Sequence, residues 1–412
     1  MNYSLRIDES RFKTNFEALA QIGATSDGGV HRPTFSDAHL QARDWFHETV
    51  TQSGLGFRID GSGNHIARLD CANSGAPSLL LGSHLDSVPN GGRFDGALGV
   101  VSALEVLFTI RDANLSLPTN LEAIDFTDEE GTLVGLLGSS ALSGRLEPVD
   151  LAEPRGGRQN LLNGLARAGL TENGLLKASR DPRSLAGYLE LHIEQGSRLA
   201  DAWINIGVVT SIVGIGSYHL SFIGRADHAG TTSMQARRDA ALGSSDFILT
   251  IRKIVLEKYP GCTANVGQAS FDPGAFNIVP QRVTLALEYR APDALTFTRL
   301  DDELLSLAKD CADRYSLGVE VEFLGKHPPA PMDPTVQDRI IEAAHSLGLT
   351  TLPLSSGAGH DAQSLAITCP AGMIFVPSVG GASHSPREFT EWQDCVNGAN
   401  VLLQTTLRMC EA

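Results

Sequence analysis

Apolar positions along the chain follow two different spacings. Over Ser10–Ile22 and Ser36–Ser53 they recur every three or four residues, which predicts two amphipathic helices, with Ser36 as the N-cap of the second. A further helix is predicted over Ala97–Ile110. Short apolar runs predict buried strands at Ser78–Gly82, Leu121–Phe126 and Gly187–Ile193. Strands that alternate with helices in this way predict a layered α/β domain.

The pattern changes at about Val213, where a second series begins. Its elements run strand, helix, strand, strand, helix, strand, over Ser217–Ile223, Asp239–Tyr259, Ala264–Ser270, Val283–Tyr289, Thr298–Tyr315 and Val319–Leu324. A β-α-β-β-α-β series predicts a ferredoxin-like α+β unit. The α/β pattern resumes afterwards with a strand near Met373–Val376. We therefore expect residues 1–212 and 327–412 to form one α/β domain, into which residues 213–326 are inserted as a smaller domain.

Composition narrows the choice of partners. The 412 residues include 32 Lys and Arg against 48 Asp and Glu, a net charge of −16, which argues against nucleic acid or an anionic membrane as the main partner. The opening MNYSLRIDESRFK has no apolar signal core, and no stretch approaches about 18 uninterrupted apolar residues, so we expect a soluble cytoplasmic protein. The six cysteines form no CxxC pair, which predicts reduced thiols and no thiolate metal site.

Side chains able to bind a metal follow the predicted strands. They are His84 and Asp86 in HLD, Asp95 in GGRFDG, the pair Glu129-Glu130, His192 in LHIEQG and His384 in GGASHSP. Imidazole nitrogen and carboxylate oxygen suit divalent cations, and open α/β sheets carry their sites at the carboxyl ends of the strands. Two cations about 3.5–4 Å apart need a shared carboxylate. Asp95, in a loop flanked by glycines, is the natural candidate for that position.

Each of these features also has an ordinary explanation. An HxD pair occurs by chance, adjacent glutamates commonly form a solvated surface pair, and a histidine in a Gly/Ser loop can belong to a simple turn. Because all of them fall at predicted strand ends, their combination favours a metal site over these separate explanations.

Longer motifs carry a resemblance over almost the whole chain, from about residue 10 to the end. They include GSHLDSVPNGGRFDGALGV, DFTDEEG, LHIEQG, GRADHAGTTSM, PGAFNIVP, EYR, SGAGHDA and MIFVPSVGGASHSPREF, in this order. The set resembles the amidase family of N-carbamoyl-L-amino acid hydrolases, β-ureidopropionases and allantoate amidohydrolases. That family is a branch of the di-metal aminoacylase and carboxypeptidase superfamily.

The resemblance implies a binuclear centre in the α/β domain. It assigns five ligands, His84 and His192 for one cation, Glu130 and His384 for the other, and Asp95 as the bridge. Glu129 resembles the family's general base, which would take a proton from the attacking water and pass it to the leaving nitrogen. Asp86 resembles the aspartate that orients a ligand histidine. The resemblance implies two divalent ions per subunit, Zn²⁺ or Mn²⁺, or else Co²⁺ or Ni²⁺.

Further positions match family residues at the substrate. They are Gln195, His228, Asn277 and Arg290, together with Gly359 and His360 in the SGAGHDA motif, where His360 could instead support the site without touching the substrate. Arg290 offers a planar fork for a substrate carboxylate, and His228 could stabilise the negative oxygen of a tetrahedral intermediate. The ordinary explanations are a surface salt bridge for Arg290, a backbone-bonded loop histidine for His228 and a turn residue for Asn277.

The resemblance therefore implies a hydrolase of non-peptide C–N bonds in linear amides. Its expected reaction splits an N-carbamoyl-L-amino acid or a similar ureido acid into amino acid, CO₂ and ammonia. Allantoate is a second possible substrate, although Thr132-Leu133-Val134 departs from the SRF that follows EEG in allantoate-specialised members. An N-acyl-amino acid deacylase or dipeptidase with the same metals, or a non-catalytic scaffold, is also open, but a scaffold is expected to lose at least one ligand. By family likeness the inserted domain serves as lid and dimerisation domain in a homodimer.

Overall fold

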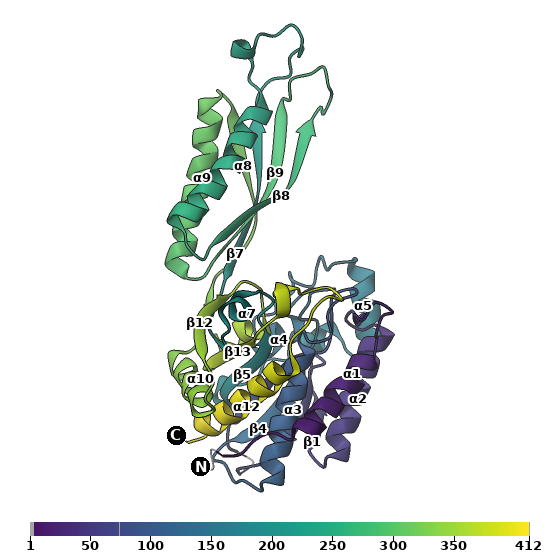
Figure 1. The fold of residues 1–412 in the computed structure, drawn as a ribbon. Helices are drawn as coiled ribbons and strands as arrows, with labels where there is room; N and C mark the ends of the chain where they lie inside the picture. Colours follow the sequence, from purple (N-terminus) through teal and green to yellow (C-terminus); the bar gives the residue numbers. More distant parts are fainter. Residues whose placement is uncertain (1–3, 74, 412) are drawn as a thin grey trace. The chain divides into compact units, whose positions relative to one another are not determined.

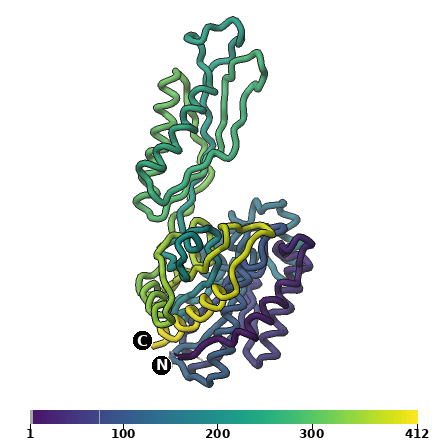
Figure 2. The backbone as a smooth tube through the Cα atoms, in the orientation of Figure 1, coloured from purple at the N-terminus to yellow at the C-terminus, as the bar shows by residue number. Residues whose placement is uncertain are grey.

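The computed structural model describes residues 4–73 and 75–411, and the chain divides into two compact units. The first unit comprises Met1–Thr210, Pro331–Leu354 and Ala358–Ala412, and the second comprises Ser211–Ala330 and Ser355–Gly357. Sequence reasoning placed the two domain boundaries at residues 212/213 and 326/327, and it assigned no part of residues 355–357 to the inserted unit. Both described ends of the chain lie in the first unit, where the Gln404 side chain donates to the Leu5 carbonyl at 2.8 Å (Figure 2).

The first unit is built on a nine-stranded mixed sheet. Its strands are β1 (Gly56–Ile59), β2 (His65–Leu69), β3 (Ser78–His84), β4 (Asn120–Phe126), β5 (Leu185–Ile193), β6 (Ile206–Ile212), β11 (Ala330–Pro331), β12 (Thr351–Ser356) and β13 (Ala371–Val376). The strand order is β1-β2-β4-β3-β5-β13-β6-β11, with β12 paired to β6. The four central strands β4, β3, β5 and β13 are mutually parallel, so their carboxyl ends meet at one edge.

Helices cover the apolar side chains of this sheet. They are α1 (Glu9–Gln21), α2 (Asp37–Gln52), α3 (Ala97–Asp112), α4 (Leu137–Leu142), α5 (Arg158–Arg167), α6 (Glu172–Leu175), α7 (Arg198–Ala202), α10 (Pro334–Ser346), α11 (Asp361–Leu365) and α12 (Trp392–Met409). The predicted cap of α2 is confirmed, because the Ser36 side chain accepts from the N–H of His39. Helix α3 is almost entirely buried, and it packs on β3 and α12 (Figure 1).

The two faces of strand β5 differ in chemistry. Leu189 and Leu191 join the large apolar core with residues of α3 and α12. The alternating residues Tyr188, Glu190 and His192 point to the opposite face and are buried as well. The sheet therefore places polar side chains inside the unit on the face that carries α11.

The second unit has the predicted order of elements. It contains β7 (Gly214–Ile223), α8 (Ala240–Lys258), β8 (Thr263–Asp272), β9 (Arg282–Ala291), α9 (Ala294–Arg314) and β10 (Gly318–His327). The sheet order β10-β7-β9-β8, antiparallel throughout, is that of a ferredoxin-like unit. Its separate core contains Phe222, Phe247, Leu285 and Leu300. The predicted fold class, an α/β unit with a smaller α+β unit, is confirmed.

Among the described residues, no helix combines the length and the apolar character needed to cross a bilayer.

Candidate metal centre

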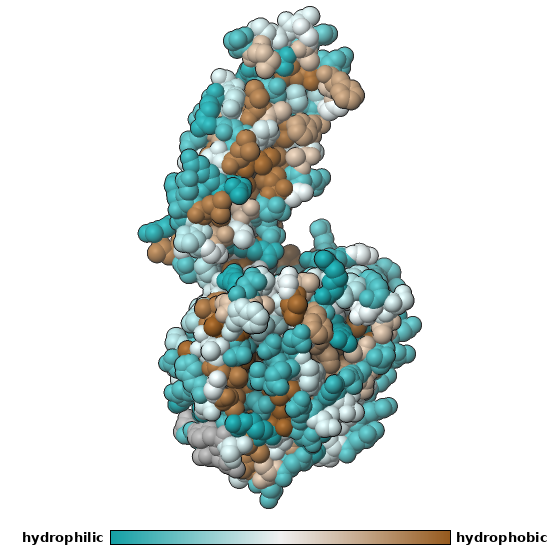
Figure 3. Space-filling model, viewed as in Figure 1, coloured by the Kyte–Doolittle hydropathy of each residue, from teal (hydrophilic) through white to brown (hydrophobic). Residues whose placement is uncertain are grey.

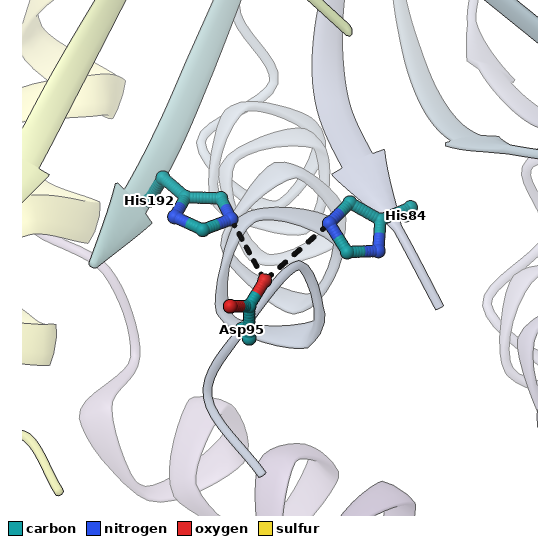
Figure 4. A group of neighbouring side chains, drawn as sticks. All are labelled: His84, Asp95 and His192. Atoms are coloured by element: carbon teal, nitrogen blue, oxygen red, sulfur yellow. Dashed lines mark ion pairs between the residues drawn. The ribbon is translucent and has the colours of Figure 1, made fainter. Parts of the chain in front are cut away.

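Five of the predicted ligands lie together at the carboxyl edge of the central strands. His84 ends β3, and His192 is the penultimate residue of β5. Glu130 lies in the turn after β4, Asp95 in the loop before α3, and His384 in the segment that follows β13. Figure 4 shows His84, His192 and Asp95 converging from separate elements.

Asp95 presents its Oδ1 atom to two imidazoles. His192 Nε2 lies 3.1 Å from this oxygen, and His84 Nε2 lies 3.5 Å from it. Two ligand atoms on one tetrahedral zinc-like cation lie about 3.4 Å apart. The spacing of these three side chains therefore fits a cation held between them.

The other oxygen of Asp95 faces a second group of ligands. His384 Nε2 lies 3.7 Å from Asp95 Oδ2 and 3.4 Å from Glu130 Oε2. Asp95 and Glu130 are nearly buried, whereas the His384 side chain is 51% exposed. Because each Asp95 oxygen serves a different group, this carboxylate is placed to be shared by two cations.

The main chain fixes the orientation of the two buried histidines. His84 Nδ1 lies 3.0 Å from the Asp86 carbonyl, and His192 Nδ1 lies 2.9 Å from the Ile193 carbonyl. A carbonyl only accepts, so in the neutral imidazole each Nδ1 carries the proton, which leaves Nε2 as the nitrogen that could bind a metal.

The charges in the cluster are poorly balanced by the protein alone. Burial, then the nearby Asp361 and Glu130 carboxylates, raise the pKa of Glu129 well above its usual value. Burial and the Asp95 charge do the same to the pKa of Glu130. Although burial opposes it, the His192 and His84 imidazoles hold the pKa of Asp95 below its usual value. A cation at this edge would offset the crowded negative charge.

Glu129 lies beside the first group of ligands. Its Oε2 atom is 3.5 Å from His84 Nε2, and only 9% of its side chain is exposed. The N–H groups of Glu129 and Glu130 donate to the two Asp86 oxygens at 3.3 and 3.2 Å. The Asp86 carboxylate is 3.7 Å from His84 Nδ1, so the atom that bonds this ring is the Asp86 carbonyl oxygen. The Asp86 carboxylate thus lies beside the His84 ring while it accepts from the backbone of the two glutamates.

A glycine is required where α3 begins. Gly96 has φ of 64°, a conformation that side chains disfavour, and an added Cβ would lie 2.4 Å from His84 Cε1. Its N–H donates to His192 Nε2 at 3.3 Å. Gly96 therefore lets the backbone pass directly beneath the two imidazoles.

Three of the predicted substrate residues belong to the first unit. Gln195 donates from Nε2 to Asp95 Oδ2 at 2.7 Å, from a left-handed backbone with φ of 58°. His360 is buried, with its ring centroid 4.6 Å from that of His192. Gly359 directly precedes His360 at the start of α11. Gln195 and His360 thus touch the ligand cluster itself.

The other three substrate candidates belong to the second unit. His228 and Asn277 lie on adjacent segments, since the Ala229 N–H donates to the Asn277 carbonyl at 2.9 Å. His228 Nδ1 accepts from the N–H groups of Gly230 and Thr231, so it is bonded to its own loop. Arg290 on β9 pairs with Glu288 at 2.8 Å and donates to the Gly357 carbonyl at 2.6 Å. The structure thus groups His228 with Asn277 and gives Arg290 separate partners.

Sequence reasoning missed several buried acids around the site. Asp128 accepts from the backbone N–H groups of Leu133, Val134 and Gly135, which closes the turn beside Glu129. Glu388 accepts from the backbone of the Asp95 loop. Both side chains bond to main-chain atoms, and a contact of this kind leaves no pattern of residue types in the sequence. The available signal was that Asp128 belongs to the DEEG motif and Glu388 to the SHSPREF motif.

Imidazole and carboxylate groups arranged around one shared aspartate in an α/β unit are the kind of site that metal-dependent hydrolases use. The chain belongs to the peptidase family M20/M25/M40, whose family model matches residues 80–408. Enzymes of this family generally use divalent metal ions.

Known relatives are similar over nearly the full length. The N-carbamoyl-L-amino acid amidohydrolase of Geobacillus stearothermophilus is 35% identical over 396 residues, 95% of this chain and 96% of the relative. The allantoate amidohydrolase of Bacillus subtilis is 32% identical over 391 residues, 94% of each chain. A hydantoinase/carbamoylase family amidase from Burkholderia multivorans superimposes with a TM-score of 0.89 at 32% identity, covering 99% of both chains. The resemblance seen in the sequence is confirmed, and the protein is a hydrolase of C–N bonds.

Proposed function

We propose that this protein is a metal-dependent amidohydrolase that cleaves the ureido C–N bond of an N-carbamoyl-L-amino acid or a similar ureido acid. The observation that carries the proposal is the placement of Asp95, whose two oxygens face two separate sets of ligands. The name of the Geobacillus stearothermophilus relative supports the choice of substrate class.

Two divalent cations would be held by His84, Asp95, Glu130, His192 and His384, with Zn²⁺ or Mn²⁺ suited to these nitrogen and oxygen donors. When bound, they would lower the pKa of a water molecule and polarise the scissile carbonyl. A shared Asp95 carboxylate would keep the two binding positions adjacent, which its contacts with His192 and His384 support.

Glu129 is the proposed general base. Its carboxylate lies at the edge of the first ligand group, while its backbone is held by Asp86. In this position it can accept a proton from the attacking water and deliver it to the leaving nitrogen. Burial favours such a role because it raises the proton affinity, and so the pKa, of the carboxylate.

We assign substrate contacts to Gln195, His228, Asn277, Arg290, Gly359 and His360. For Arg290 the expected partner is the carboxylate of the substrate. In the structure its guanidinium donates to the Glu288 carboxylate and to the Gly357 carbonyl, two contacts that a substrate carboxylate would have to compete with. His228 is expected to donate to the substrate carbonyl oxygen as negative charge develops there.

Allantoate is the second candidate substrate, supported by the name of the Bacillus subtilis relative. N-acyl-amino acids and dipeptides are two further substrate classes that the same metal centre could hydrolyse. Cleavage of a ureido acid or of allantoate releases ammonia, whereas hydrolysis of an N-acyl-amino acid or a dipeptide does not. The test is a substrate panel of N-carbamoyl-L-amino acids, β-ureidopropionate, allantoate, N-acetyl-amino acids and dipeptides, with ammonia and free amine measured separately. Turnover of only the last two classes would contradict the proposal.

We also propose that the protein forms a homodimer through the second unit. Strand β8 is an edge strand, and α8 exposes leucines at seven-residue intervals, Leu242, Leu249 and Leu256. Leu249 is 74% exposed and Leu256 65%, and apolar side chains gather on the visible face of this unit (Figure 3). Light scattering should give twice the monomer mass, and Leu249→Glu should reduce it to the monomer. Leu295→Glu, at an exposed position on α9, is the matched control.

A further inference from the structure

A buried glutamate outside the ligand set holds the loop that carries Asp95. Glu388 lies between β13 and α12 and is only 4% exposed. Its Oε1 atom accepts from the backbone N–H of Phe94 at 2.8 Å and from that of Asp95 at 3.1 Å. Both donors are removed from water, so an N–H group left without this acceptor would cost its full desolvation penalty.

The same carboxylate is linked to the Asp95 side chain. The Ser383 hydroxyl lies 3.1 Å from Asp95 Oδ2 and 3.3 Å from Glu388 Oε2. Ser383 precedes the ligand His384. Glu388 therefore connects the Asp95 loop with the segment that carries the second histidine.

The loop is shaped to admit this side chain. A Cβ added at Gly92 would lie 1.9 Å from Glu388 Cδ, so the Glu388 carboxylate occupies the space that a side chain at this position would need. Next to it, the Phe94 ring packs on Phe16 with centroids 5.0 Å apart. The segment from Gly92 to Asp95 is thus folded around Glu388 on one side and packed into the core on the other.

We infer that Glu388 is a positioning residue. By holding the backbone of the Asp95 loop, it sets the position and orientation of the Asp95 carboxylate so that each oxygen would reach its own cation. This inference rests on the proposed function, because it assumes that Asp95 bridges two ions. Without the acceptor, two buried N–H groups would lack partners and the loop would shift to satisfy them. A shift of the bridge would weaken one binding position more than the other.

The test is a titration of the metal-free protein with Co²⁺. Calorimetry measures the affinity of each site, and the visible absorption bands report the coordination geometry. Glu388→Ala should weaken the weaker Co²⁺ site at least 10-fold and change the bands. Glu388→Gln should stay within about 3-fold of the wild type, because its carbonyl oxygen can still accept both N–H groups. Glu391→Ala, an exposed glutamate in the same segment, should have no effect.

Gly92→Ala provides a second route to the same result, since its methyl group would displace an intact Glu388. It should reproduce the Glu388→Ala phenotype, and the double variant should be no worse than either single one. If the wild type binds two Co²⁺ ions and both single variants bind them with unchanged affinity and spectrum, Glu388 has no positioning role and the proposed function stands. If the wild type does not bind two ions, both proposals are wrong.

Discussion

The backbone N–H of Glu129 donates to Oδ1 of Asp86 at 3.3 Å, so the proposed base is anchored through its main chain. Asp86 Oδ2 accepts from the next N–H, that of Glu130, and from the Thr34 hydroxyl. We predict that Asp86→Ala lowers kcat about 10- to 100-fold, since the turn loses both acceptors. Asp86→Asn should lose less, because one acceptor oxygen remains. Steady-state kinetics check this, and equal losses in the two variants would contradict the anchoring role.

Glu129→Gln should lower kcat by about 10²- to 10⁴-fold while both metal ions stay bound. The amide has the shape of the carboxylate but cannot accept the proton. Kinetics combined with elemental analysis of the purified protein provide the measurement. Glu48→Gln, at an exposed position on α2, is the matched control. A near-normal rate in Glu129→Gln would show that another group is the base.

Arg290→Ala should raise KM steeply for substrates with a free carboxylate, with a smaller effect on kcat. The guanidinium fork would bind that carboxylate in two-point fashion, which Arg290→Lys cannot restore. The comparison is between each substrate and its amide-capped analogue, with Arg299→Ala on α9 as a control. If the wild type handles capped and free substrates equally, the role assigned to Arg290 is refuted.

Removal of metal should abolish activity and lower the Tm. Ions that bind only the folded state stabilise it by mass action, and here they would also neutralise the crowded carboxylates of Glu129 and Glu130. We expect chelation followed by added Zn²⁺ or Mn²⁺ to restore both properties. Full activity in an exhaustively stripped sample would eliminate the metal mechanism.

We predict that the buried His65 lowers the free energy of unfolding in mild acid. Burial, then the charge of Arg43, lowers its pKa to about 3, below the ordinary value of 6.5. The unfolded chain therefore binds the proton more readily, so stability is complete above about pH 6.5 and falls as the pH drops towards 3. Between pH 7 and pH 5 this one group should cost about 2 kcal/mol.

The check is urea unfolding of metal-free protein at both pH values. His65→Phe can keep the ring packing with Phe46 and Phe57, and it should reduce the difference between pH 7 and pH 5 by that amount. His327→Phe replaces an exposed histidine and should leave the difference unchanged. A pH dependence that is the same in His65→Phe and wild type would contradict the prediction.

The sequence predicted those elements whose spacing is long and regular. Helix α3 and strands β3 and β5 have continuous apolar character because both sides of the sheet are covered, and they were found within two residues at each end. Strands β1 and β2 were missed, because GFRI and HIARL are short and mixed in polarity, and β1 is the edge strand of the sheet. Strand β12 was missed for a similar reason, since TLPLSS has little apolar alternation.

The candidate ligands could be predicted because metal chemistry restricts the residue types and strand ends restrict their positions. The contacts that hold the loops carrying these ligands could not be predicted. Asp86 and Glu388 both act on backbone N–H groups, which every residue except proline possesses. No side-chain pattern marks such a partner, so only the three-dimensional path of the chain reveals it.

The carbonyl oxygens that hold Nδ1 of His84 and His192 have an evolutionary consequence. A side chain can be exchanged by a single mutation, but a carbonyl belongs to whatever amino acid occupies the position. The choice of Nδ1 as the protonated nitrogen of each neutral ring therefore depends on the path of the backbone where strands β3 and β5 end. Descendants of this chain could alter the residues that select a substrate and still keep the same pair of nitrogen lone pairs ready for a cation.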